Sequence, residues 1–95
     1  MMDLSRRANI SELVGVLSSI VELVLSEETE FIESLTYSAQ ADFEVPLGMS
    51  ARMLSNGGYS TMEFLSAACT VRYCAEPHMA EFPDELVQML SRLPR

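Results

Sequence analysis

Cys74 and His78 are the two side chains whose types and spacing come closest to chemistry. Four positions apart, they would share one face of a helix, as two metal ligands or a nucleophile and its base do. A structural zinc site needs four ligands, and Cys69 would point to a different helical face. Pro77 also interrupts a helix directly before His78. A Cys/His metal site or a cryptic enzyme is therefore an alternative hypothesis, and we expect no catalytic residue, metal ligand or cofactor.

Carboxylates are concentrated in the first half of the chain, where residues 8–51 contain eight acids and no Lys or Arg. With a net charge of −8, the chain should repel phosphate and anionic lipid, so we expect no nucleic-acid or membrane partner. The same field can steer a basic protein surface into contact. We assign this steering to four glutamates: Glu27, Glu28, Glu30 and Glu33. The alternative is a nucleic-acid-mimicking inhibitor that uses the acidic segment from Glu22 to Glu44.

Seven methionines are many for a chain of 95 residues. Five of them lie in the second half: Met49, Met53, Met62, Met79 and Met89. Flexible thioethers can line an adaptable binding groove, although filling gaps in a core is their more frequent role. We expect two residues to be displayed for a partner, namely Tyr59 beside a glycine turn and Met79 in a loop between two prolines.

A long apolar stripe begins near Asn9 and predicts an amphipathic helix. Its members recur at alternating steps of three and four: Ile10, Leu13, Leu17, Ile20 and Val24. Further valines and leucines widen the stripe, so this helix should be the hub of the fold or a dimer seam. We assign partner binding to this face and to the two displayed residues: Leu13, Leu17, Ile20, Val24, Tyr59 and Met79. Residues 1–8 are expected to be a short disordered N-terminus.

The middle of the chain holds two signals that interrupt helices. A break near Ser26 is favoured over one continuous helix through residues 9–40, although both arrangements remain open. Pro46 disfavours helical backbone at the residue before it, and Gly48 adds freedom. These two residues predict an extended segment or loop over residues 42–48, followed by a short helix over residues 49–55.

Turn and capping residues divide the second half of the chain. Residues 56–58, Asn-Gly-Gly, should end a helix, because Asn and Gly tolerate the left-handed conformation found there. Ser60 and Glu63 have the spacing of a capping box and predict a helix that reaches about Ala75. Pro83 suits the first position of a final helix.

Length and composition limit the fold and the function. The chain is long enough for one domain over residues 1–95, and a 48% hydrophobic content predicts a folded core with apolar surface left over. We therefore predict an all-α bundle of four to five helices that associates as a homodimer. Free thiols favour the reducing cytoplasm. The predicted function is a small acidic regulatory protein that binds another protein through an apolar helical face, as inhibitors, anti-activators and chaperone-like adaptors do.

Overall fold

The computed structural model describes residues 2–25 and 35–94, and over these residues every regular element is helical. The elements are α1 (Met2–Leu25), α3 (Tyr37–Asn56), α4 (Thr61–Ala75), the 3-10 helix η1 (Glu76–Glu81) and α5 (Asp84–Ser91). The predicted all-α class is therefore confirmed. Among the described residues, no helix combines the length and the apolar character needed to cross a bilayer.

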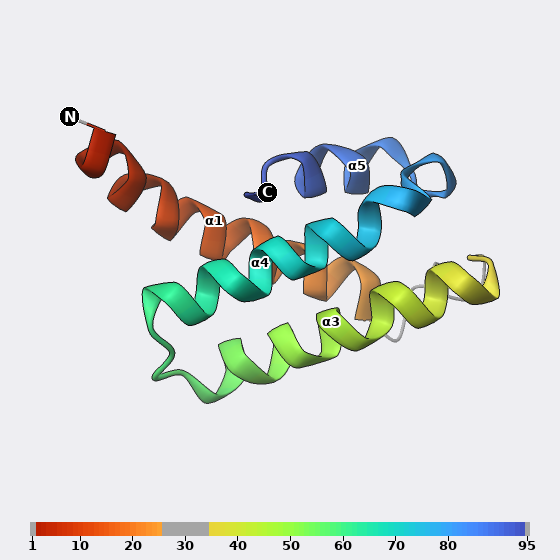
Figure 1. Cartoon of the computed structure of the whole chain (residues 1–95), viewed down its shortest axis with the longest axis horizontal. Helices are drawn as coiled ribbons and strands as arrows, with labels where there is room; N and C mark the ends of the chain where they lie inside the picture. The colour runs from red at the N-terminus through yellow and green to blue at the C-terminus, as the bar shows by residue number, and fades with distance from the viewer. Residues whose placement is uncertain (1, 26–34, 95) are drawn as a thin grey trace.

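Helix α1 is central to the bundle, which is one of the two arrangements that its wide apolar stripe predicts. It contacts α3, α4 and α5, and it passes behind α4 in the view of Figure 1. The helix begins at Met2, within residues 1–8, for which the sequence predicts a disordered N-terminus. No Gly or Pro interrupts this stretch. Helix α1 ends at Leu25, next to the predicted break, and the helix expected from Glu27 lies outside the described residues.

Helix α3 runs continuously through Pro46 and Gly48, which corrects the loop predicted over residues 42–48. A proline inside a helix costs about 3 kcal/mol, because it removes one backbone N–H and crowds the preceding turn. Burial of a mostly apolar face opposes this cost, since residues at helical spacing turn inward. These buried residues are Ala39, Phe43, Pro46, Leu47 and Ser50. The ring of Phe43 stacks on Phe82, with their centroids 5.1 Å apart.

A glycine turn joins α3 to α4 and sets the two helices side by side in opposite directions (Figure 1). Gly57 and Gly58 both have φ of 70°, the left-handed region that the sequence predicted for this turn. The predicted capping box is also present. The Ser60 hydroxyl accepts from the Glu63 N–H at 3.1 Å, and the Glu63 carboxylate accepts from the Ser60 N–H at 3.2 Å. This box starts α4 at Thr61.

The core lies where the four α-helices meet. Its apolar members are Val16, Leu17, Ile20, Val24, Leu35, Ala39, Phe43, Leu47, Phe64, Ala68, Val71, Ala75, Phe82, Leu86, Leu90 and Leu93. Polar contacts close the C-terminal end of the bundle. Arg72 of α4 donates to the carbonyls of Ser91 and Leu93 at 2.8 and 2.6 Å, and Arg92 forms an ion pair with Glu12 of α1.

Candidate functional site

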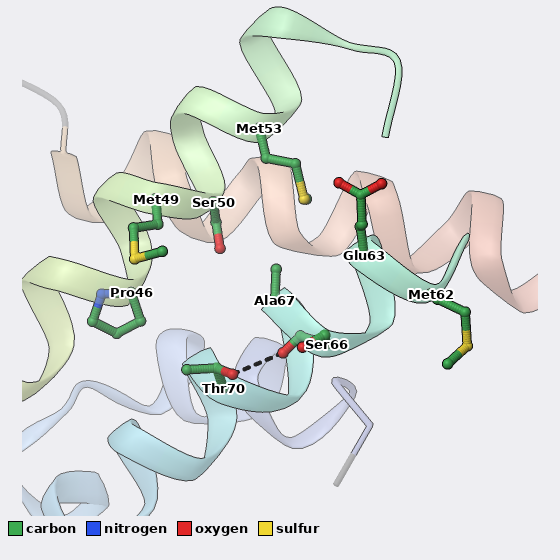
Figure 2. Close-up of a pocket in the computed structure, with 9 residues that line it drawn as sticks. All are labelled: Pro46, Met49, Ser50, Met53, Met62, Glu63, Ser66, Ala67 and Thr70. Carbon is green, nitrogen blue, oxygen red and sulfur yellow. Dashed lines mark hydrogen bonds between the residues drawn. The ribbon is translucent and has the colours of Figure 1, made fainter. Parts of the chain in front are cut away.

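A groove of about 600 Å³ lies between α3 and α4 on the surface of the bundle (Figure 2). It is lined by Pro46, Met49, Ser50, Met53, Met62, Glu63, Ser66, Ala67 and Thr70. Helical spacing explains this gathering, because the lining positions on each helix are three or four residues apart and so share one face. The Asn-Gly-Gly turn then brings the two faces together.

Large and small side chains oppose each other across the groove, which keeps it open. Figure 2 shows Met53 and Ser50 extending from α3 towards α4, where Ala67 is the facing side chain. Met49 and Met62 lie at the margins of the groove and are 59% and 76% exposed. The site is therefore an apolar groove with flexible thioethers at its mouth.

Most of the large exposed apolar side chains belong to the same two helices. Of the six large hydrophobic residues exposed in the described part of the chain, five belong to α3 or α4. They are Tyr37, Val45, Met49, Met62 and Tyr73. Apolar surface gathered on one helix pair marks a contact surface more strongly than the same residues scattered singly.

Ser50 places an unpartnered hydroxyl in this groove. Its side chain is 1% exposed, and its Oγ has no hydrogen-bond partner. Two other hydroxyls on helices donate a hydrogen bond to the backbone carbonyl four residues earlier in the chain. Thr70 donates to Ser66 and Ser91 donates to Val87, both at 2.8 Å. The Ser50 hydroxyl instead points from α3 towards α4 (Figure 2), and a buried unsatisfied hydroxyl costs about 1–3 kcal/mol.

Carboxylates lie at both ends of the helix pair. Glu63 lines the groove near the start of α4. A second hollow, of about 410 Å³, lies near the opposite end and is lined by Asp42, Tyr73, Cys74, Glu76 and Pro77. No Lys, Arg or His is among the residues that line these two hollows. The chain thus presents an apolar centre between acidic ends.

His78, which the alternative hypothesis pairs with Cys74, contacts carboxylates in the structure. His78 lies between two carboxylates, with Nε2 2.9 Å from Asp42 and Nδ1 3.5 Å from Glu81. Hydrogen bonds from the Thr36 backbone and hydroxyl, and the adjacent His78, lower the pKa of Glu81 against a smaller effect of burial. Over residues 2–25 and 35–94, no three His, Cys, Asp or Glu side chains gather closely enough to hold a metal ion.

The residues assigned to partner binding from sequence lie in or against the core. Leu17, Ile20 and Val24 are buried, and Leu13 packs against them. The reason is that α3, α4 and α5 cover the stripe of α1 within the chain itself. Those three buried side chains therefore cannot offer a surface to a partner of the folded chain.

Two further residues differ from their expected placement. Tyr59 is half-buried with its ring centroid 6.1 Å from that of Phe64, instead of being displayed at the turn. Met79 is half-buried and packs against the core, because η1 folds the predicted loop onto the bundle. The groove takes their place as the candidate binding surface.

Parts of the acidic segment lie outside the described residues. Glu27, Glu28, Glu30 and Glu33 are among them, so their steering role stays a prediction. Glu22 and Glu44, at the two ends of the segment, are exposed.

The α3 side of the groove has one signal in the sequence. Val45, Met49 and Met53 are four positions apart and would have shown an apolar helical face. Because a loop was predicted around Pro46, the helical spacing of these residues was not considered.

The fold and the groove define a small all-α protein with an acidic surface and an apolar groove between two antiparallel helices. Comparisons with family models, with curated proteins and with solved structures found no match to the chain.

Proposed function

We propose that this chain is a small acidic regulatory protein that acts by binding a segment of another protein in the groove between α3 and α4. The observation that carries the proposal is the methionine-lined groove, in which Met49 and Met62 expose most of their surface. An inhibitor, an anti-activator and a chaperone-like adaptor would each use such a surface in the same way. The proposed binding of a protein segment in the groove is therefore common to these three kinds of regulatory protein.

A protein segment fits the groove better than a small molecule does. Small-molecule sites are usually concave and enclose 70–90% or more of a drug-sized ligand. Here the methionines stand at an open mouth, where they could repack around a long apolar ligand. A groove between two helices also has the shape that accepts a third helix.

The proposal relocates the apolar face predicted from sequence. That prediction placed the face on α1, whose stripe is buried, while the exposed apolar residues lie on α3 and α4. Self-association through another surface, as in the predicted homodimer, is compatible with this proposal and stays a prediction. The groove itself is proposed for a different protein, because a second copy would add its own net charge of −8. The free thiols of Cys69 and Cys74 favour a reducing compartment such as the cytoplasm.

Site-specific photo-cross-linking in cells that make the protein tests this function. A photoreactive amino acid replaces Met49 or Met62 in the groove, and replaces exposed Gln88 on α5 as the matched control. We expect a discrete cross-link to another protein from both groove positions and none from position 88. Cross-links from position 88 alone, or only between copies of this chain, would contradict the proposal.

A further inference from the structure

We infer that the occupant of the groove is an amphipathic helix with basic residues at both ends and one hydrogen-bonding side chain near its centre. This inference depends on the proposed function and specifies the partner of the same site. It combines three features of the α3 and α4 pair: the length of the surface, the charge at its ends and the hydroxyl inside it.

The length of the surface matches about three turns of helix. On α3 it runs from Asp42, through Pro46 and Met49, to Met53, a distance of about 16 Å at 1.5 Å per residue. On α4 it runs in the opposite direction, from Met62 to Tyr73. Because consecutive members on each helix are three or four positions apart, both rows follow one face of their helix. A partner helix lying along these rows would place apolar side chains at positions i, i+3 or i+4, and i+7 against the methionines.

The carboxylates at the two ends of this surface favour a partner helix with basic residues at its own ends. Glu63 stands at one end, and Asp42 and Glu76 stand at the other, with no basic side chain lining either hollow. Existing contacts hold these carboxylates in place: the capping box holds Glu63, His78 holds Asp42, and Arg72 lies 3.7 Å from Glu76. Asp42 nevertheless remains 58% exposed, so its carboxylate can accept further hydrogen bonds. Lys or Arg at each end of a bound helix would meet a carboxylate.

The unpartnered hydroxyl of Ser50 favours a partner helix with a hydrogen-bonding side chain near its middle. Pro46 and Met53 lie one turn before it and about one turn after it, so Ser50 is central among the α3 residues of the groove. Its Oγ makes no hydrogen bond within the chain and points towards α4 (Figure 2). Thr70, on the facing helix, already donates its hydroxyl to Ser66. A donor or acceptor entering between Met49 and Met53 would give Ser50 the partner that the chain does not supply.

Four synthetic helices, stapled to hold their conformation, test the inference by fluorescence anisotropy. The first has a leucine face, Lys and Arg at both ends and a central Gln on that face. The second replaces the basic ends by Glu, and the third replaces the central Gln by Leu. The fourth rearranges the first so that no apolar face remains. Each is titrated with the unaltered chain and with Met49→Glu, Ser50→Ala and Gln88→Glu, after circular dichroism has confirmed that each variant is helical.

We expect the first helix to bind about tenfold more tightly than the second and the fourth. Met49→Glu should weaken its binding by about tenfold or more, whereas Gln88→Glu, with the same change of charge on α5, should not. Ser50→Ala should weaken the binding of the first helix and leave the affinity for the third helix unchanged.

Different negative results distinguish an error in the proposed function from an error in the inferred partner. If the three helices with an apolar face all failed to bind, the proposed function and this inference would both be overturned. If the first and second bound equally well, and Met49→Glu weakened both, the groove would stand and the basic-ended partner would be wrong. If Ser50→Ala changed the first and third helices alike, the role given to the hydroxyl would be wrong.

Discussion

Glu81 holds Thr36 through two hydrogen bonds across a separation of 45 residues in sequence. The Thr36 backbone N–H donates to one carboxylate oxygen at 3.0 Å, and its hydroxyl donates to the other at 3.2 Å. Thr36 is also the N-cap of α3, where its hydroxyl oxygen accepts from the Ala39 N–H. The contact therefore ties η1 to the start of the helix that forms one wall of the groove.

This contact makes the stability of the fold depend on pH. The Thr36 backbone hydrogen bond is the main cause that lowers the pKa of Glu81 from its ordinary value of 4.5. A lowered carboxyl pKa contributes stability that is complete above 4.5 and is lost as the pH falls through the pKa of the folded state. Glu81→Gln should lower the urea midpoint at neutral pH and reduce the fall of that midpoint as the pH drops below 4.5. Glu44→Gln, on an exposed part of α3, is the control. Identical pH profiles for the chain and Glu81→Gln would refute the contact.

Local signals in the sequence predicted the C-terminal end of α3 and the start of α4 well. The Asn-Gly-Gly turn and the Ser60–Glu63 capping box depend on a few neighbouring residues, and both occur where they were predicted. The wide apolar stripe of α1 was also apparent from local spacing, and it left two roles open, the hub of the fold or a dimer seam. Such features are accessible from sequence because the residues that determine them are adjacent or lie on one helical face.

Features that depend on distant contacts were not accessible in the same way. Pro46 indicates a loop on local grounds, and the helix passes through it because Phe43 and Leu47 are buried, with Phe43 stacked on Phe82 of a remote segment. The stripe of α1 was recognised, but whether the chain or a partner covers it depends on the tertiary packing. The groove therefore emerged only after α3 and α4 were placed side by side.

Continuity of α3 through Gly48 predicts a gain in stability on substitution by alanine. An added Cβ at Gly48 would meet nothing within 4 Å, and the residue has no positive φ. Gly48→Ala should therefore raise the free energy of unfolding by about 0.5–1 kcal/mol. Gly57→Ala is the opposite control, because its φ of +70° should make the same change destabilising. A loss of stability from Gly48→Ala in urea denaturation would be inconsistent with a helix at this position.

The unpartnered hydroxyl of Ser50 predicts that binding and stability conflict at this residue. Ser50→Ala removes a buried unsatisfied group and should raise the free energy of unfolding by about 1–3 kcal/mol. Ser66→Ala, in the middle of α4 and exposed, controls for the higher helix propensity of alanine. Both are measured by urea denaturation. A Ser50→Ala gain no larger than that of the control would mean that the hydroxyl is satisfied in solution.

The acidic segment should affect how fast a partner arrives more than how long it stays. Exposed charges are screened beyond about 8 Å at physiological salt, so they steer encounter, whereas buried apolar contacts set dissociation. Replacing Glu27, Glu28, Glu30 and Glu33 together by Gln should slow association of the basic-ended helix and flatten its salt dependence. Surface plasmon resonance across a salt series separates the two rates. A loss of binding mainly through faster dissociation would favour the nucleic-acid-mimicking inhibitor, because the carboxylates would then be the contact.

Methyl NMR of the chain labelled at its seven methionines tests the central claim most directly. Met49, Met53 and Met62 line the groove, whereas Met79 and Met89 pack against the core and provide internal controls. On addition of the basic-ended helix, we expect the methyl signals of the three groove methionines to shift or broaden together, with Met79 and Met89 unchanged. Changes centred on Met79 or Met89, with the groove signals unaffected, would contradict binding between α3 and α4.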